Sequence, residues 1–213
     1  MSRTVRLDLV HMEAANLAEA VDLLRSGKVV AYPTETLYGL GVDAADASAV
    51  RRLRALKGRD EGKPILVLVD GLTMLESIAG PIPDAAKACV ERFWPGPLSI
   101  VLPADSRLPR ELTAGTGTIG VRVSSHPVAR LLPALLGSPI TSTSANPTGS
   151  PGAASAEAVA EAFGSGVDLI LDTGTAVSPT PSTVIDFTST EPRILREGAV
   201  PREALFRVIG LEG

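Results

Sequence analysis

Short apolar runs alternate with amphipathic segments along most of this chain, and this alternation constrains the fold more than any other feature. The run 65–69 contains only aliphatic residues, which is typical of a strand in a sheet covered on both faces. Segments with the apolar spacing of helices stand before and after it, over 47–57 and 72–77. The sequence therefore predicts the α/β class, with helices packed on a sheet.

Capping and turn residues give the limits of the predicted elements. Asn16 and Glu19 are spaced as a capping box, which starts a helix that ends at Gly27. Asp46 is the predicted N-cap of the helix 47–57, and Gly58 ends that helix. Other helices are expected at 83–93, 127–136, 156–163 and 201–209, and other strands at 28–32, 98–102, 119–123, 139–141, 169–171 and 184–187.

Length and composition are those of a globular protein. The 213 residues correspond to one large domain or to one and a half, and the apolar fraction of 45% supplies a core even though aromatic residues make up only 3%. The single Cys89 excludes an intramolecular disulfide and a multi-cysteine metal site. With His11 and His126 as the only histidines, no resident metal site is predicted.

The net charge of −4 argues against a protein whose whole surface binds nucleic acid, although a local basic patch is compatible with it. No apolar run reaches the roughly 18 residues that a membrane-spanning helix needs. The N-terminus also has no signal-peptide core. We therefore expect a cytoplasmic protein without a membrane segment.

The stretch 142–147, which reads STSANP, is the most informative polar motif. Its three hydroxyls and one amide follow a short apolar strand and open a loop rich in Gly, Pro and Ser. Ligands bind at strand ends in α/β sheets, and short polar side chains beside backbone N–H groups suit phosphate or carboxylate oxygens. By itself the motif favours an ordinary Asn-Pro turn, so its interpretation depends on what accompanies it.

Six basic residues fall between positions 51 and 63. Arg51 and Arg54 are three residues apart and fit the solvated face of a helix. Lys57 and Arg59 flank Gly58, where the chain leaves that helix, so both side chains are expected to be exposed in a cleft and to hold phosphates. The alternative, which this segment alone favours, is that they only complement the helix dipole.

Two common catalytic motifs do not fit the chain. The stretch 58–63 resembles a P-loop, but it has three residues rather than four between its glycines, and Pro64 follows Lys63 in place of Ser or Thr. There is no credible Ser/His/Asp arrangement and no Gly-x-Ser-x-Gly elbow. Cations and hydroxyls without a nucleophile suit a catalyst that positions anionic substrates and stabilises charge on phosphoryl oxygens.

Arg122 stands inside the apolar strand 119–123, where period-two alternation places it on one face with Thr118 and Gly120. A buried Arg needs a partner, which is either an acidic side chain or a ligand carboxylate. Arg196 raises the same question, with Glu197 and solvent as simple answers.

Together and in this order, these motifs resemble the YrdC-like family of threonylcarbamoyl-AMP synthases. Lys57-x-Arg59 with Ser144-x-Asn146 matches the pair of signatures of the synthase branch, and the chain ends soon after the last matching segment, so we expect the single-domain form. The similarity covers about 16–208 and rests on eight segments: AYPTETLYGLG (31–41), LKGR (56–59), KPILVLV (63–69), RFWPGPLSIVL (92–102), TIGVRV (118–123), SANPTG (144–149), PSTVID (181–186) and ILREGAV (194–200).

The resemblance implies a YrdC/RibB-like fold, a twisted mixed α/β sheet with helices packed on it around a central, positively charged cavity. It implies an L-threonylcarbamoyladenylate synthase, a nucleotidyltransferase that forms threonylcarbamoyl-AMP and pyrophosphate from L-threonine, bicarbonate and ATP, with Mg²⁺ accompanying the nucleotide. A tRNA-modifying threonylcarbamoyl-transferase complex would then use the product for N6-threonylcarbamoyladenosine. Direct RNA binding is also compatible with such a cavity.

The same resemblance assigns roles to residues of this sequence. Lys57 and Arg59 would be catalytic and would contact the nucleotide. The residues expected to bind threonine are Thr34, Lys63, Arg122, Ser142 and Ser182. The residues expected to bind the nucleotide are Lys57, Arg59, Thr118, Ser144, Asn146, Gly152 and Arg196; some relatives have Ser at position 152, so a contact there would come from the backbone.

Two other functions stay open on the sequence. An RNA-binding module would use the basic run 51–63, although the scarcity of aromatic residues removes most stacking platforms for single strands. A carbamoyl-transfer domain of hydrogenase-maturation proteins shares the fold, but those long chains carry zinc-finger-like and acylphosphatase-like segments that this sequence does not contain.

Overall fold

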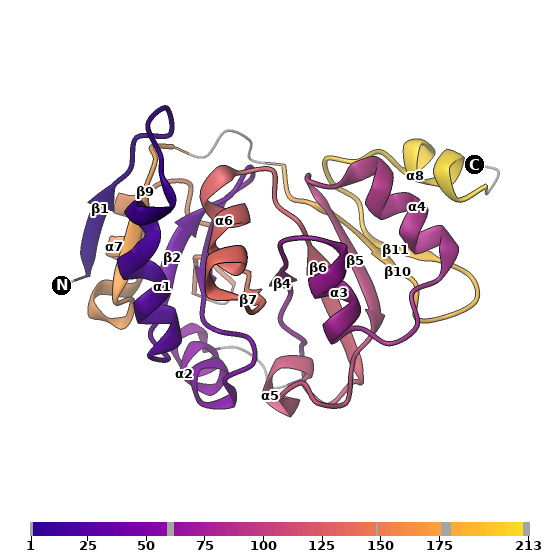
Figure 1. The fold of residues 1–213 in the computed structure, drawn as a ribbon, viewed down its shortest axis with the longest axis horizontal. Coiled ribbons are helices and arrows are strands. Elements are labelled where there is room, and N and C mark those ends of the chain that lie inside the picture. The colour runs from indigo at the N-terminus through magenta and orange to yellow at the C-terminus, as the bar shows by residue number, and fades with distance from the viewer. Residues whose placement is uncertain (1, 59–61, 148, 176–179, 211–213) are drawn as a thin grey trace.

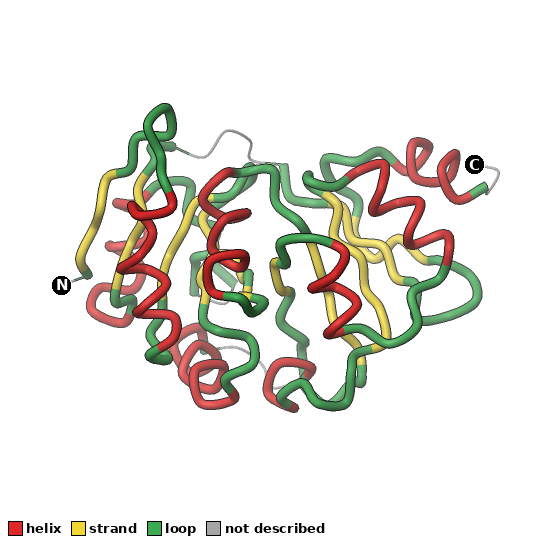
Figure 2. Tube along the Cα trace, in the orientation of Figure 1, coloured by secondary structure: helices red, strands yellow, loops and turns green. Residues whose placement is uncertain are grey.

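The computed structural model describes all residues except 1, 59–61, 148, 176–179 and 211–213. Its strands form two mixed sheets with helices packed against them, which confirms the predicted α/β class and divides the strands between two sheets (Figures 1 and 2). The first sheet has the strand order β1-β9-β2-β3-β8. Its strands are β1 (Arg3–Arg6), β2 (Val30–Pro33), β3 (Tyr38–Gly41), β8 (Thr143–Ser144) and β9 (Leu169–Asp172).

The second sheet has six strands in the order β11-β10-β5-β6-β4-β7. Its central strand β5 pairs antiparallel with β6 and parallel with β10. Its strands are β4 (Val67–Leu68), β5 (Leu98–Pro103), β6 (Thr118–Arg122), β7 (Ile140–Thr141), β10 (Thr183–Asp186) and β11 (Arg193–Arg196).

Helices cover both faces of the first sheet. Helices α1 (Ala18–Arg25) and α6 (Pro127–Leu136) pack side by side in front of it in the view of Figure 1. Val30 and Tyr32 point toward these two helices, whereas Ala31 between them joins the larger core that contains the apolar side of α2 (Ala47–Lys57). This is the period-two alternation of a strand covered on both faces.

Of the remaining helices, α7 contacts β9 of the first sheet, and the 3-10 helix η1 contacts α1 and α6. Helices α4 and α8 contact each other, and the short α5 contacts α2. β1 and α8 lie at opposite ends of the longest axis (Figure 1). No helix of the described residues is both long and apolar enough to cross a bilayer. These elements are α3 (Leu72–Ile78), α4 (Asp84–Phe93), α5 (Arg110–Thr113), α7 (Ala156–Phe163), α8 (Arg202–Ile209) and the 3-10 helices η1 (Ala14–Leu17) and η2 (Gly164–Gly166).

The chain crosses from the second sheet to the first at Ser142. β7, just before it, pairs with β4, and β8, just after it, pairs with β3. Thr141 is held from the first sheet, because its Oγ1 accepts from the Val42 N–H at 3.0 Å and its carbonyl accepts from the Tyr32 hydroxyl at 2.8 Å. The STSANP motif therefore lies at the junction of the two sheets.

The predicted limits of α2 are confirmed. The Asp46 carboxylate accepts from the N–H groups of Ser48 and Ala49, at 2.8 and 3.2 Å, which satisfies two backbone donors of the first turn. Gly58 ends the helix with a φ of 57°, a left-handed conformation that glycine adopts at low cost.

Two predicted limits are wrong. The capping box joins Glu13 and Asn16 around η1, rather than Asn16 and Glu19, and α1 begins only at Ala18. Four residues of the run 65–69 are buried and Leu66 is partly buried, but only Val67–Leu68 pairs as strand β4. The Ile65 N–H donates instead to the Leu112 carbonyl, outside the sheet.

Four strands were not predicted: β1, β3, β8 and β11. Among the predicted strands, β2 begins at Val30 and includes Pro33, which pairs with Tyr38 in the hairpin of β2 and β3. The strand ends at Pro33, one residue beyond its predicted limit.

Candidate active site

A cavity of about 700 Å³ lies at the junction of the two sheets. Its walls come from the turn between β2 and β3, from β6, β10 and β11, and from the loop after β8. This volume is typical of sites that bind small molecules. The cavity is the strongest candidate for a functional site in the described part of the chain, because most of the predicted site residues line it.

Strand β6 confirms the predicted face of Arg122. Thr118, Gly120 and Arg122 line the cavity, whereas Ile119 and Val121 are fully buried in the core on the other side. Alternation along one strand therefore places a guanidinium and a hydroxyl in the cavity wall while its apolar residues anchor the sheet.

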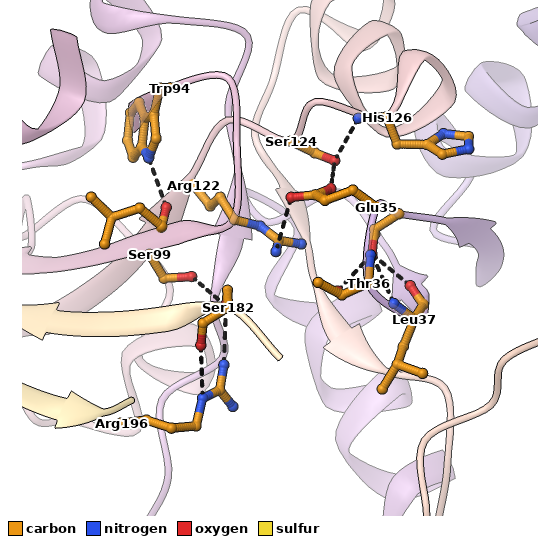
Figure 3. Close-up of polar contacts among 12 residues, drawn as sticks. Glu35, Thr36, Leu37, Trp94, Ser99, Arg122, Ser124, His126, Ser182 and Arg196 are labelled. Atoms are coloured by element: carbon orange, nitrogen blue, oxygen red, sulfur yellow. Dashed lines mark hydrogen bonds and ion pairs between the residues drawn. The ribbon is translucent and has the colours of Figure 1, made fainter. Parts of the chain in front are cut away.

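Arg122 has an acidic partner inside the protein. Its Nη1 lies 3.3 Å from Oε1 of Glu35, which is in the turn between β2 and β3 (Figure 3). The Ser124 hydroxyl donates to the other oxygen of Glu35, and the His126 N–H donates to the Ser124 hydroxyl at 3.2 Å. Of the two partners left open by the sequence, an acidic side chain is therefore present, and Arg122 also lines the cavity.

Arg196 contacts Ser182 with two nitrogens on the other side of the cavity. Its Nε donates to the Ser182 carbonyl and its Nη2 to the Ser182 hydroxyl, both at 3.0 Å (Figure 3). Ser99 lies 3.1 Å from the same hydroxyl. Partial burial, and secondarily the positive charge of Arg122, lower the pKa of Arg196. The two guanidiniums thus face a common space that favours an anionic ligand.

The Thr34 hydroxyl holds the polar turn in shape. It donates to the Leu37 carbonyl at 2.6 Å and accepts from the N–H groups of Thr36 and Leu37, each at 3.2 Å. Such a side-chain turn fixes the backbone between β2 and β3. Thr34 and Thr36 are both buried and line the cavity from this turn.

The loop after β8 is held by Asn146, which donates to the carbonyls of Pro147 and Ser150. Its Oδ1 is buried without a hydrogen-bond partner among the described residues, so it can accept from a ligand. Gly152 lines the cavity with its backbone. A Cβ at this position would lie 2.5 Å from Cδ1 of Leu37, so a side chain there would require Leu37 to move.

The expectation that the Lys57 side chain is exposed is wrong. It is buried, with 5% exposure, rather than exposed in a cleft, and its Nζ donates to the Ser144 carbonyl. Lys63 is exposed and is not among the residues that line the cavity. Arg59 lies outside the described residues.

The other basic residues of the run 51–63 mainly cross-link the fold. Arg51 forms an ion pair with Glu111 of α5. Arg54 donates to the backbone carbonyls of Glu111 and Lys63, at 2.6 and 2.8 Å. These contacts tie α2 to α5. Arg51 is exposed as expected for a solvated helix face, whereas Arg54 is partly buried, so that expectation is wrong for Arg54.

The structure brings together nine of the twelve predicted site residues in the cavity wall. They are Thr34, Thr118, Arg122, Ser142, Ser144, Asn146, Gly152, Ser182 and Arg196.

Among the residues at the site that were not predicted are Glu35, Asp186 and Leu195. Glu35 lies behind Arg122, and Asp186 and Leu195 line the cavity. A signal for Glu35 was available, because it is the only charged residue between Lys28 and Asp43. No comparable signal marks Asp186 and Leu195, whose places depend on the pairing of β10 with its neighbours.

The cavity suits Mg²⁺ only as an ion carried by a nucleotide. Among the residues that line it, Asp186 is the only carboxylate, and the described residues contain no group of three or more metal-ligating side chains. Mg²⁺ in nucleotide sites is commonly held by one or two carboxylates together with phosphate oxygens. Asp186 is the residue that fits this role.

Fold and cavity define a class of protein: an α/β protein with two arginines and several hydroxyls in a small-molecule cavity between two mixed sheets. The chain belongs to the Sua5/YciO/YrdC family, whose model carries the description telomere recombination and matches residues 22–198.

Curated relatives and solved structures give the same family. The chain is 42% identical over 191 residues to the threonylcarbamoyl-AMP synthase of Pyrococcus abyssi (strain GE5 / Orsay), covering 90% of this chain but 56% of the relative. It is 44% identical over 163 residues to that of Thiobacillus denitrificans, covering 76% of this chain and 86% of the relative. A crystal structure of P. abyssi Sua5 complexed with L-threonine matches with a TM-score of 0.92 and 40% identity, covering 99% of this chain and 61% of that one.

Proposed function

We propose that this chain is an L-threonylcarbamoyladenylate synthase, a nucleotidyltransferase that forms threonylcarbamoyl-AMP and pyrophosphate from L-threonine, bicarbonate and ATP. The observation that carries the proposal is Arg122, which lines the cavity while its buried Nε has no hydrogen-bond partner among the described residues. The names of the relatives and the threonine complex of the P. abyssi protein support the same activity. Residues 1–213 would form one YrdC-like domain.

In this proposal Arg122 binds the carboxylate of threonine through a charge-assisted pair of hydrogen bonds. Hydroxyls of Thr34, Ser142 and Ser182 surround the rest of the amino acid. Lys63 is the fifth residue proposed to bind threonine, and it would have to approach the amino acid from outside the present cavity wall. The support for this arrangement is that Arg122 and the three hydroxyl residues line one cavity.

The nucleotide would bind along the part of the wall that carries Thr118, Ser144, Asn146 and Arg196, with the backbone of Gly152. Lys57 and Arg59 are the catalytic cations. Arg59 neutralises phosphate charge, and Lys57 contributes its charge from behind Ser144, to which it is hydrogen-bonded. A positive cavity is part of this proposal. Mg²⁺ would add charge neutralisation on the phosphates.

The chemistry then needs no protein nucleophile. The amine of threonine attacks the carbon of bicarbonate, water leaves, and a carbamate forms. A carbamate oxygen attacks the α-phosphorus of ATP while the bond from that phosphorus to the bridging oxygen breaks, and pyrophosphate leaves. The protein aligns the reactants and neutralises charge. The product would pass to a complex that modifies tRNA.

Pyrophosphate release tests the proposal. Purified protein is incubated with ATP, bicarbonate and each of a panel of amino acids, and each substrate is omitted in turn. We expect release only when threonine, bicarbonate and ATP are all present. No release, or release that does not depend on the amino acid, would contradict the proposed function.

A further inference from the structure

Glu35 lies outside the cavity but against one of its arginines. It does not line the cavity, and its side chain is 16% exposed, while that of Arg122 is 5% exposed. Ser124 donates to one of its oxygens, and Ser124 is in turn held by the His126 N–H. The carboxylate is therefore fixed from behind and presented to the guanidinium (Figure 3).

The ion pair between Glu35 and Arg122 is electrostatically favourable but incomplete as a hydrogen-bonded contact. The two closest atoms are 3.3 Å apart, which is longer than the usual separation in a charge-assisted hydrogen bond. Oε1 of Glu35 and Nε of Arg122 are both buried without a hydrogen-bond partner among the described residues. The pair thus balances a buried charge and leaves hydrogen-bonding capacity on the guanidinium for a ligand.

Arg122 needs such a balance because a second guanidinium, that of Arg196, lines the same cavity. The repulsion between these two positive charges adds to the cost of burying Arg122. A buried guanidinium without a counter-ion is costly and reorients toward any available acceptor. A carboxylate that is itself held by Ser124 prevents this reorientation.

We propose that Glu35 is a positioning residue, which holds the Arg122 guanidinium in the cavity wall so that it meets the carboxylate of the amino-acid substrate. This inference rests on the proposed function, because it assigns Glu35 to the amino-acid side of that site. Glu35 acts through Arg122 and does not touch the substrate.

The test compares Glu35→Gln, Arg122→Lys and the double variant in steady-state pyrophosphate release. Glu35→Gln removes the charge at nearly constant size and should raise the KM for threonine by about tenfold, as expected when a charge-assisted contact is misaligned. The KM for ATP should change by less than about twofold, and kcat should change little. Glu161→Gln, on an exposed helix position, is the matched control and should keep wild-type values.

The double variant separates positioning from a general structural role. If Glu35 acts through Arg122, Glu35→Gln should add little to the effect of Arg122→Lys on the KM for threonine. Equal increases in both KM values, full additivity, or an unchanged KM for threonine would each overturn the inference.

A conservative variant covers the case in which Glu35→Gln does not fold. Glu35→Asp keeps the charge but withdraws it by one methylene, so it should raise the KM for threonine to an intermediate value. A wild-type KM for threonine in Glu35→Asp would then overturn the inference. Wild-type protein without threonine-dependent release would overturn the proposed function and this inference with it, whereas an active wild type with unaffected variants would overturn the inference alone.

Discussion

Lys57 donates a hydrogen bond from Nζ to the backbone carbonyl of Ser144, across 87 positions of sequence. Lys57 is the last residue of α2 and Ser144 is the last residue of β8, so the contact joins the Lys-x-Arg and Ser-x-Asn motifs. The buried ammonium thus packs inside the protein and holds the segment of Ser144, which lines the cavity.

Replacement of Lys57 by Met should lower both stability and turnover. The variant keeps much of the apolar stem but loses the charged donor, so the free energy of unfolding should fall by about 1.5–3 kcal/mol. Pyrophosphate release should fall by at least about tenfold, because a positive charge near the phosphates is removed. Urea unfolding and steady-state release measure the two effects. Lys28→Met, at an exposed position, is the control; a less stable Lys57→Met with normal release would make Lys57 purely structural.

Gly198 should not tolerate a side chain. A Cβ at this position would lie 2.3 Å from the Pro181 carbonyl oxygen and 2.6 Å from the carbonyl carbon of Ser182. Gly198→Ala should therefore displace the segment that carries Ser182 and cost about 1–3 kcal/mol of stability by overpacking. Threonine-dependent release should also fall, because Arg196 loses its partner. Gly71→Ala, where no atom lies within 4 Å of an added Cβ, should behave like wild type. Similar unfolding curves for the two variants would refute the prediction.

His126 should make stability depend on pH. Burial lowers its pKa below the ordinary value of 6.5, although the charge of Glu35 opposes the shift. The unfolded chain therefore binds the proton more readily, and the contribution of neutral His126 to stability is complete above about pH 6.5 and is lost as the pH falls through the lower folded-state pKa.

Thermal unfolding of His126→Asn between pH 7 and pH 5 measures this effect. The variant should lose less stability than wild type over this interval, because it has no group to protonate at this site. Parallel profiles for wild type and His126→Asn would show that His126 does not contribute.

The proposed site should reject substrates that lack the threonine hydroxyl. A site that hydrogen-bonds a hydroxyl discriminates against its loss far more strongly than an apolar pocket discriminates against a missing methyl. Serine should be a weak substrate, and valine should be weaker still. Activation of valine as efficiently as threonine would remove Thr34 and Ser182 from the recognition of the side chain.

Elements defined by local signals could be predicted from the sequence. Helix α2 is an example, because Asp46 at its start and Gly58 at its end act through backbone groups a few residues away. The cavity face of β6 also followed from alternation alone. The first and last residues of the two-residue strands β7 and β8 could not be predicted in this way, because the pairing of β7 with β4 and of β8 with β3 depends on segments far away in the sequence.

The same distinction applies to the site. The position of Arg122 in an apolar strand predicted that its charge has a partner, but the sequence left an acidic side chain and a ligand carboxylate as alternatives. Glu35 meets Arg122 only because the turn between β2 and β3 packs beside β6. The two residues are 87 positions apart in the sequence, so no local signal pairs them. Lys57 was expected in a cleft because it stands at the end of a helix. Its hydrogen bond to the Ser144 carbonyl joins two distant segments and therefore has no local signal in the sequence.

The identity of the reaction product tests the central claim most directly. Wild-type protein is incubated with threonine, ATP and isotopically labelled bicarbonate, and the nucleotide products are separated and analysed by mass. The account predicts one adenylate that contains AMP, threonine and the labelled carbon, formed with an equal amount of pyrophosphate and absent when threonine is omitted. Pyrophosphate formed without this adenylate, or an adenylate that carries threonine without the labelled carbon, would contradict it.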